Sequence, residues 1–408
     1  MGINIDTQHT SSGDQFSLLV LQSVAELIEH KKQWDSFVEA VGSDIYFLVD
    51  WLETWMKFYG KHCDLRCYVV RKNEQIIAVL PFCLERLRIG FVSVRIARFV
   101  GSYGTIAVFS PPIQSGYEMQ VMKLILSSLL AAEKCDAVCL SPLSGEVPLS
   151  GIDDWSDTSE REFVLLDKKD IGVHTLFALP DTIEEFLTSL GKRRKKKYLY
   201  EVRSLSKKFE IENRAIQEEE AIRYFDVFVH FHTKLWQEMG RLGHFGDWPD
   251  SLEFNRELVR RMAPKGRVKF YELSAGERPL SMGYSFELGT TSFNRLTARD
   301  TSADLKKFGL GRVGYIKILE LLIGEGKKIE ETGPGHYDYK MVIGGQERQM
   351  KRLIFTKASL GAVAKTKLYV KMSEWLHFFY YRVWFLKLSP KLGLRSKPLW
   401  TFWIKAKL

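Results

Sequence analysis

The chain has 408 residues, more than one hydrophobic core usually supports, so we expect two domains of roughly 150 to 200 residues. Hydrophobic residues make up 45% of the chain and charged residues 27%, which is typical of a globular protein. Its net charge of +9 comes from residues 361–408, which hold ten Lys or Arg and one acid, Glu374. The rest of the chain balances 49 basic against 49 acidic side chains, which excludes a generally cationic body that coats nucleic acid.

The chain opens on polar residues, with no basic segment followed by an apolar one, so we expect disorder through residue 20 and no secretion signal. Its five cysteines are odd in number, form no CxxC pair and lie in apolar surroundings. This pattern argues against a disulfide framework and against a zinc site, and it favours a reducing compartment. We therefore expect a cytoplasmic protein without a metal. The cysteines are Cys63, Cys67, Cys83, Cys135 and Cys139.

A helix and a hairpin are the first elements that the sequence predicts. Residues 45–59 place aromatic side chains at helical spacing and predict an amphipathic helix with a buried face. Two strand-like runs follow, 65–71 and 76–84, separated by a polar turn. The aromatic residues of the helix are Phe47, Trp51, Trp55 and Phe58.

The same arrangement recurs in the second half of the chain. Strand-like runs 268–273 and 279–288 flank a polar turn, and an aromatic segment around Trp236 precedes them. We interpret this as a weak internal duplication, with two unrelated hairpins as the alternative. The residues that match in spacing are Tyr68 and Glu74 in the first hairpin and Tyr271 and Glu277 in the second.

A domain boundary is expected near residues 167–180, where a polar segment leads into Pro180 and a new helix. Asp181 is a suitable N-cap for that helix, with Glu184 three residues further on. The predicted parts are a disordered start (1–20), an N-terminal domain (21–175), a C-terminal domain (176–360) and a basic aromatic tail (361–408).

The segment from Lys306 to Gly314 carries the most specific signal. Its glycines open a predicted helix, 315–323, where backbone N–H groups can approach phosphates and the helix dipole favours an anion. Its cations add positive charge at the same place. The predicted phosphate-binding residues are Lys306, Lys307, Gly309, Gly311, Arg312 and Gly314.

Two alternatives apply to this segment. Its glycines also fit the GxGxxG pattern of dinucleotide-binding folds, with Glu330 and Glu331 about 20 residues further on. Such a loop follows a buried apolar strand, whereas residues 300–307 are polar and no parallel βαβ pattern surrounds them, so the dinucleotide fold is disfavoured. A loop whose glycines are only structural remains open.

Lys306-x-x-Gly309-x-Gly311 resembles the R/Q-x-x-G-x-G/A pyrophosphate loop of GNAT acyltransferases, with Lys in the first position. The residues that follow are similar to the CelD/FemAB-like branch of that superfamily, in which a second glycine, an acid, another glycine and a Tyr-Lys pair come at fixed intervals. This chain departs from the branch in having Gly309-Leu310 for Ser-Pro and Glu331 for Asp. The matching residues are Gly311, Gly326, Glu331, Gly335, Tyr339 and Lys340.

The resemblance extends over residues 40 to 355. The branch's H…W…G..G.F stretch matches the segment from His232 to Phe245, and residues 47–55 with Leu80-Pro81 resemble its N-terminal half. It implies an α/β (α+β) fold of two tandem GNAT-like domains with mixed central sheets, followed by a helical tail. The residues of the stretch are His232, Trp236, Gly240, Gly243 and Phe245.

The resemblance also implies transfer of an acyl group from acetyl-CoA or another acyl-CoA to an amine of a cell-envelope or polysaccharide precursor, either small or lipid-linked. Because a thioester is already activated, the protein has to orient donor and amine, hold the phosphates and accept a proton. Two alternatives stay open: a Fem-type transferase that uses aminoacyl-tRNA, and a non-catalytic GNAT-like scaffold in polysaccharide biosynthesis.

Motif position supplies the candidate site residues. His232, Glu331 and Asp338 are candidates for the proton acceptor, and Tyr339 for the proton donor to the leaving thiolate. Each also has a structural interpretation: His232 as a packed helix histidine, and Glu331 as the end of a strand. The remaining candidates, Trp236 and Lys340, are expected to contact the substrate.

Two basic features complete the sequence. Residues 192–197 (KRRKKK) begin a predicted amphipathic helix, so a solvated face or a contact to an anionic substrate is favoured over tRNA. The tail, over residues 365–408, combines its cations with eleven aromatic residues, and its least polar stretch, 375–388, is too short to span a bilayer. It predicts a peripheral anchor to an anionic inner-membrane surface. Packing of this helix on the catalytic domain or on a partner protein is the alternative.

Overall fold

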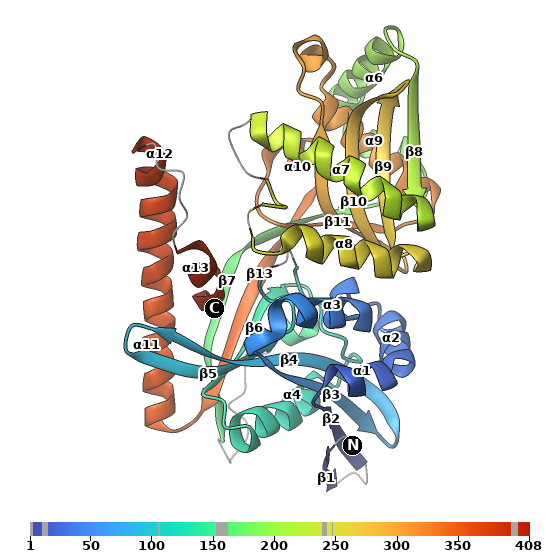
Figure 1. The fold of residues 1–408 in the computed structure, drawn as a ribbon. Helices are drawn as coiled ribbons and strands as arrows, with labels where there is room; N and C mark the ends of the chain where they lie inside the picture. Colours follow the sequence, from blue (N-terminus) through green and yellow to red (C-terminus); the bar gives the residue numbers. More distant parts are fainter. Residues whose placement is uncertain are drawn as a thin grey trace. The chain divides into compact units, whose positions relative to one another are not determined.

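The computed structural model describes residues 3–9, 15–104, 107–151, 162–238, 243–246, 248–392 and 399–408. The chain forms two compact units (Figure 1). The first unit comprises residues 1–171 and 349–408, and the second comprises residues 172–348. The second unit is therefore inserted, in sequence, between two pieces of the first.

The first unit is built around a mostly antiparallel sheet in which β5 and β6 run parallel. Its strand order is β1-β2-β3-β4-β5-β6-β13. The strands are β1 (Ile3–His9), β2 (Gln15–Leu21), β3 (Asp64–Lys72), β4 (Gln75–Ile89), β5 (Val92–Phe99), β6 (Ala137–Ser144) and β13 (Gln346–Lys357). The helices are α1 (Val24–Glu29), α2 (Lys31–Ala40), α3 (Val49–Tyr59), α4 (Glu118–Leu126), α11 (Leu360–Leu376), α12 (Ser389–Lys391) and α13 (Trp400–Ala406).

The second unit repeats this plan with strand order β7-β12-β11-β10-β9-β8, and here β11 and β12 are the parallel pair. Its strands are β7 (Phe163–Ala178, of which residues 163–171 lie in the first unit), β8 (Ile211–Gln217), β9 (Val268–Ala275), β10 (Arg278–Leu288), β11 (Thr291–Arg299) and β12 (Ile329–Pro334). Its helices are α5 (Ile183–Ser189), α6 (Lys192–Ser206), α7 (Glu218–Glu238), α8 (Ser251–Met262), α9 (Leu310–Gly324) and α10 (Asp338–Val342).

Each unit contains three consecutive antiparallel strands, then a helix, then a strand parallel to the third. In the first unit these are β3, β4, β5, α4 and β6, and in the second they are β9, β10, β11, α9 and β12. Both predicted hairpins are present. The predicted fold class, two tandem GNAT-like units with mixed sheets and a C-terminal helical segment, is confirmed.

The ends of the chain differ from the predicted division. Residues 15–21 form β2, which pairs with β3, and the buried side chains of Phe16, Leu18 and Val20 alternate with more exposed ones. In a β-strand, alternate side chains point to the same face of the sheet. The segment is ordered because this apolar face is buried and its backbone pairs with β3. Residues 349–408, which include the predicted tail, belong to the first unit. The strand just before the tail, β13, pairs there with β6, and Leu353 lies opposite Leu140.

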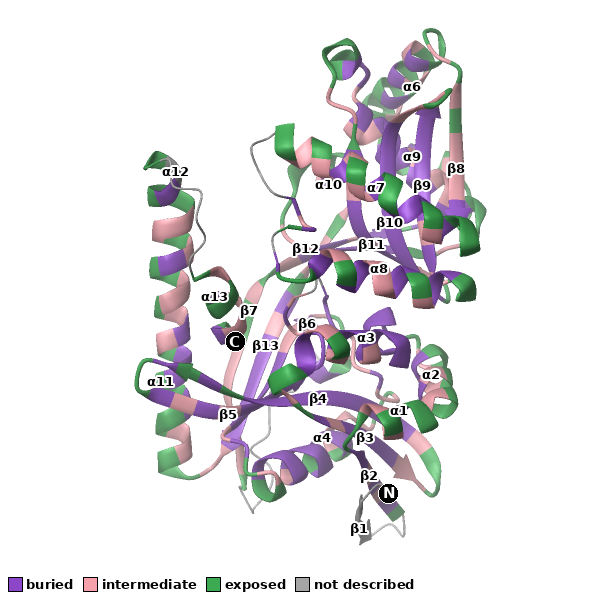
Figure 2. Ribbon diagram, viewed as in Figure 1, coloured by how far each residue is buried: buried purple, intermediate pink, exposed green. Residues whose placement is uncertain are grey.

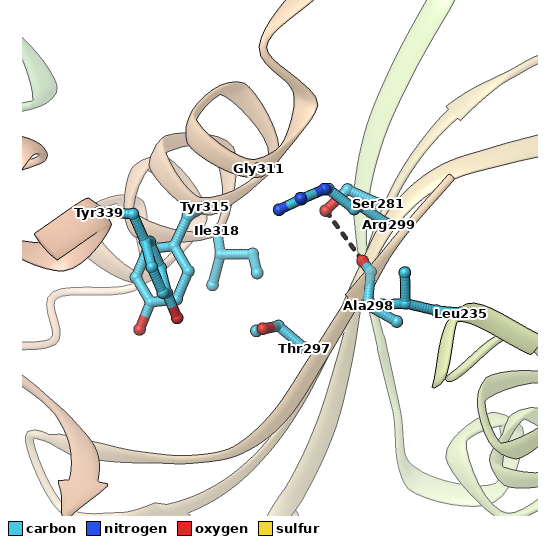
Figure 3. Close-up of a pocket in the computed structure, with 9 residues that line it drawn as sticks. All are labelled: Leu235, Ser281, Thr297, Ala298, Arg299, Gly311, Tyr315, Ile318 and Tyr339. Atoms are coloured by element: carbon cyan, nitrogen blue, oxygen red, sulfur yellow. Dashed lines mark hydrogen bonds between the residues drawn. The ribbon is translucent and has the colours of Figure 1, made fainter. Parts of the chain in front are cut away.

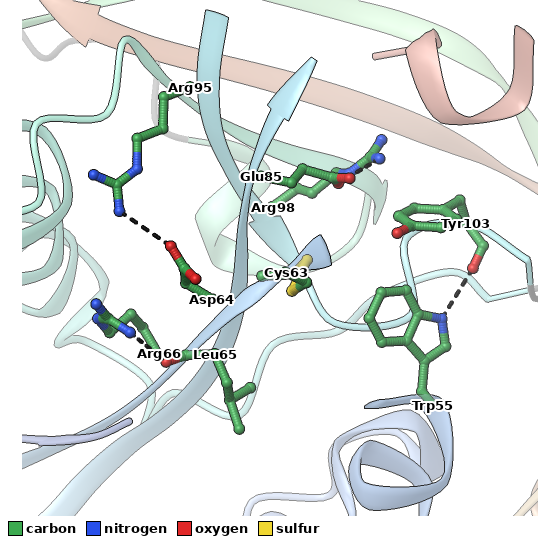
Figure 4. Close-up of a disulfide and its surroundings, with 10 residues drawn as sticks. Trp55, Cys63, Asp64, Leu65, Arg66, Glu85, Arg95, Arg98 and Tyr103 are labelled. Atoms are coloured by element: carbon green, nitrogen blue, oxygen red, sulfur yellow. Dashed lines mark hydrogen bonds and ion pairs between the residues drawn. A yellow bond between two sulfur atoms is a disulfide. The ribbon is translucent and has the colours of Figure 1, made fainter. Parts of the chain in front are cut away.

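Two cysteines contradict the expectation drawn from their spacing. Cys63 and Cys83 form a disulfide with their Cα atoms 5.4 Å apart, shown in Figure 4. The β3–β4 register explains it, because Leu65 lies opposite Cys83 and Cys63 stands two residues before it. The pairing was missed because it depends on register and not on spacing along the chain. Cys67, Cys135 and Cys139 are free and buried.

The core of the second unit holds α9 tightly against its sheet. Ile316 and Leu319 on α9 are fully buried. Gly314 meets β10 so closely that a Cβ there would lie 2.2 Å from the Oγ of Ser281. Only glycine allows this approach, so Gly314 determines how closely the first turns of α9 pack on β10.

Candidate active site

The parallel strands β11 and β12 lose their pairing where α9 begins. Within the described residues, the ladder joins Thr291–Phe293 to Ile329–Glu331. Beyond it β11 continues to Arg299, paired with β10, while β12 pairs with β7. The carboxyl end of β11 therefore offers an open edge, as expected where a ligand lies between two separating strands.

A pocket of about 120 Å³ lies at this end of β11, within the second unit (Figure 3). Strands β10 and β11 and three helices, α7, α9 and α10, contribute the residues that line it. The residues that line it are Leu235, Ser281, Thr297, Ala298, Arg299, Gly311, Tyr315, Ile318 and Tyr339.

One part of the pocket has the properties of an anion site. Gly311 lies in the first turn of α9, and a Cβ at this position would be 2.6 Å from Nη1 of Arg299. The missing side chain thus brings a guanidinium next to the free N–H groups of a helix N-terminus. Arg299 is exposed, and its guanidinium makes no hydrogen bond or ion pair with a described residue, while its backbone belongs to the β10–β11 ladder. A cation without a partner beside a helix N-terminus is suited to bind phosphate.

Most of the other predicted phosphate-loop residues have different contacts. Arg312 pairs with Glu201 of α6, with 2.9 Å between Nε and Oε2. Lys306 and Lys307 are exposed on a 3-10 turn, Ala303–Phe308, and neither lines the pocket. Gly314 packs against β10 as described above. Gly309 is the N-cap of α9, with a φ angle of +62°. Of the predicted phosphate-binding residues, Gly311 is the one that lines the pocket.

Tyr339 is the predicted catalytic residue that lines the pocket. Desolvation raises the pKa of its phenol to about 12, with Tyr337 as a further cause and Arg299 opposing the shift. The phenol is therefore protonated at neutral pH and can donate a proton. Gly311 and Tyr339, predicted from separate motifs, meet in one pocket.

His232 and Trp236 lie in an aromatic cluster on α7. The Nε1–H of Trp236 donates to Nε2 of His232 over 2.9 Å, and the ring of Phe245 packs edge-on against the histidine. Burial, with His244 as a second cause, lowers the pKa of His232 to about 3. The imidazole is therefore neutral, and its accepting nitrogen is already in use. These contacts favour the structural interpretation of the stretch, of which Gly240 lies outside the described residues.

The other three candidates lie around the end of β12 without lining the pocket. Glu331 pairs with His174, with 2.8 Å between Oε2 and Nδ1. Asp338 is almost fully exposed and contacts His336. Lys340 is buried and donates to the carbonyl oxygen and hydroxyl of Thr332, at 3.0 and 2.9 Å, and burial lowers its pKa to about 8. Among the described residues no cluster of His, Cys, Asp or Glu is placed to hold a metal ion.

Sequence reasoning missed Arg299, Thr297, Ser281 and Tyr315. The available signal was the strand-like run TSFNRLTAR, which ends at Arg299. Its place beside Gly311 depends on how α9 sits on the sheet, which spacing along the chain does not specify.

Comparison with known proteins agrees with this geometry. Residues 192–341 match a family model described as an acetyltransferase (GNAT) domain. The fold is similar to that of FemX, with a TM-score of 0.57, 12% identity, and coverage of 79% of this chain and 95% of FemX. A conserved protein of unknown function from Bacteroides thetaiotaomicron has a TM-score of 0.49 and 10% identity, with 82% of this chain and 97% of that protein covered. L-PGS from Bacillus licheniformis has a TM-score of 0.48 and 10% identity, with 83% of this chain and 95% of L-PGS covered. No curated protein sequence matches the chain.

The separating parallel strands, the glycine-opened helix and the family match define the second unit as an acyltransferase domain of the GNAT type. The first unit has the same strand and helix order. Residues 192–341 therefore form a GNAT-type acyltransferase domain, and the fold of the chain is similar to that of FemX.

Proposed function

We propose that the protein transfers an acyl group from an acyl-CoA to an amine of a cell-envelope or polysaccharide precursor, either a small molecule or a lipid-linked one. The observation that carries this proposal is the meeting of Arg299, Gly311 and Tyr339 in one pocket at the end of β11. An unpartnered cation beside a helix N-terminus fits a pyrophosphate, and a protonated phenol in the same pocket fits a leaving thiolate.

The residues then have distinct roles. Acyl-CoA supplies an activated thioester. The first-turn N–H groups of α9 and the guanidinium of Arg299 hold the pyrophosphate, and Gly311 keeps the space between them open. Tyr339 donates its phenolic proton to the sulfur as the thiolate leaves. Because the described lining contains no carboxylate or imidazole, we propose that water carries away the proton of the attacking amine.

Calorimetric titration of acetyl-CoA and longer acyl-CoAs tests the donor site. Gly311→Glu places a carboxylate at the proposed pyrophosphate position and is expected to abolish binding. Gly324→Glu is the matched control, because Gly324 lies at the other end of the same helix and a Cβ there meets nothing within 4 Å. Thiol release with amino-sugar acceptors then tests transfer. Equal binding by wild type and Gly311→Glu would contradict the assignment.

The Fem-type alternative has one supporting observation. On α6, the side chains of Lys192, Arg193, Arg194, Lys196 and Lys197 are exposed, and such a surface can contact nucleic acid. Failure of every acyl-CoA to bind, together with salt-sensitive tRNA binding that is lost when these residues are neutralised, would favour this alternative. Failure of both ligands would favour the scaffold.

A further inference from the structure

The C-terminal helix has one face that packs on the first unit. It runs through α11 and continues as His377–Leu388 into α12, in orange and red in Figure 1. The hydroxyl of Ser373 donates to the carbonyl of Ala406 over 2.9 Å, and Tyr369 and Tyr380 are buried. Part of the aromatic content of the tail therefore stabilises the first unit, whereas the packing alternative named the catalytic domain or a partner protein.

Exposed residues alternate with intermediate and buried ones along this helix (Figure 2), and three of its aromatic side chains are exposed. Trp375 is 59% exposed, Phe378 49% and Phe379 63%, and no described segment covers them. Leu368 and Leu386 are exposed on the same helix. We call Leu368, Trp375, Phe378, Phe379 and Leu386 the aromatic face. A run of large apolar side chains in water is costly, so it marks an interaction surface.

A second segment lies beside this helix. The tip of the β4–β5 hairpin approaches α11 so closely that a Cβ on Gly90 would lie 3.3 Å from Cε of Met372. The next residue, Phe91, is 81% exposed, and Arg86 and Arg88 on the same hairpin are exposed as well. Two segments distant in the sequence therefore present exposed aromatic and basic side chains near each other.

The charges around the aromatic face have one sign. Lys371, Arg382, Lys387 and Lys391 are exposed, and the sequence has no acid after Glu374. Glu374 itself pairs with Lys169 over 2.7 Å and with Arg352 over 3.4 Å. Cations interleaved with aromatic side chains complement the interface of an anionic bilayer, where rings lie at headgroup depth and cations meet lipid phosphates.

We propose that the aromatic face binds the surface of an anionic lipid bilayer and that the hairpin tip at Phe91 adds to the contact. Among the described residues no helix is long and apolar enough to cross a membrane, so the contact is with one leaflet. This proposal does not depend on the proposed acyl transfer, since none of its residues lines the pocket. Binding to the bilayer would hold the enzyme close to lipid-linked acceptors.

Vesicle flotation of the full chain tests the proposal. We expect the protein to float with phosphatidylcholine vesicles that contain phosphatidylglycerol, to stay behind with phosphatidylcholine alone, and to be released by salt. The variant Trp375→Ser/Phe378→Ser/Phe379→Ser is expected to lose about tenfold or more in vesicle affinity. The variant Arg382→Gln/Lys387→Gln is expected to weaken binding to the anionic vesicles and to make the remaining binding less sensitive to salt.

A matched control carries three serines at exposed apolar positions elsewhere: Ile28, Tyr200 and Val227. It is expected to float like the wild type, and circular dichroism of all variants checks their folding. Equal flotation of the wild type and the folded Trp375 triple variant would overturn the proposal. So would a wild type that ignores anionic vesicles but self-associates in light scattering through the same residues, because the face would then be a protein contact.

Discussion

Replacing Arg299 by Gln is expected to weaken acyl-CoA binding about 30-fold. A Cβ on Gly311 would be 2.6 Å from Nη1 of Arg299, so a phosphate bound by the first turn of α9 lies within reach of the guanidinium. A hydrogen bond to a charged group contributes about 2 kcal/mol, which corresponds to roughly 30-fold in Kd. Because Arg299 has no described partner, the substitution leaves no buried acid unpaired and should not alter stability.

Calorimetry at several salt concentrations measures this effect. The wild-type affinity is expected to fall more steeply with salt than that of Arg299→Gln, because one ionic contact is missing from the variant. Lys306→Gln is the matched control: it removes the cation at the first position of the loop motif, which lies outside the pocket, and should leave affinity unchanged. Normal binding by Arg299→Gln with lost binding by Lys306→Gln would refute the reasoning and restore the motif-based assignment.

Three further predictions concern catalysis and stability. Tyr339→Phe should lower kcat by about 100-fold with little change in the affinity for acyl-CoA, and an unchanged kcat in a thiol-release assay would exclude it as the proton donor. Burial raises the pKa of Glu330 from its ordinary 4.5 to about 8, so the folded chain holds this proton more tightly than the unfolded chain. The stability that this proton contributes is complete below about pH 4.5 and is lost as pH rises to about 8. In urea unfolding, Glu330→Gln should therefore show a flatter pH dependence than the wild type and should be more stable than the wild type at pH 8 by a few kcal/mol. Parallel pH profiles of the two proteins would disprove this. Gly314→Ala should destabilise the protein by about 1 to 3 kcal/mol, because its Cβ would overlap Ser281. Gly324→Ala faces open space and should stabilise the protein by about 0.5 to 1 kcal/mol. Equal urea midpoints for the two variants would contradict the close packing of Gly314 on β10.

Local patterns predicted the elements that build the site. The two hairpins each join two strand-like runs through a polar turn, and the helix that became α9 follows a glycine, so each could be identified from neighbouring residues. The internal duplication was visible because both hairpins have similar spacing. Gly311 and Tyr339 could be predicted as candidates because each belongs to a short motif, and both line the pocket.

Contacts between distant segments could not be predicted in this way. The disulfide of Cys63 depends on the β3–β4 register, and the place of Arg299 depends on the packing of α9. The motif cations Lys306 and Arg312 do not line the pocket, because Lys306 lies on a 3-10 turn and Arg312 pairs with Glu201. Burial, which makes His232 neutral, is likewise a property of the folded chain.

The insertion of the second unit into the first has a consequence for biosynthesis. Residues 172–348 are contiguous and can fold as soon as they have left the ribosome, whereas the first unit lacks β13 until the whole second unit has been made. The edge of β6 that β13 later covers, around Leu140, is then an unpaired strand edge in the nascent chain. Slow translation after residue 348 would lengthen this exposure, and a chaperone that shields strand edges would shorten it.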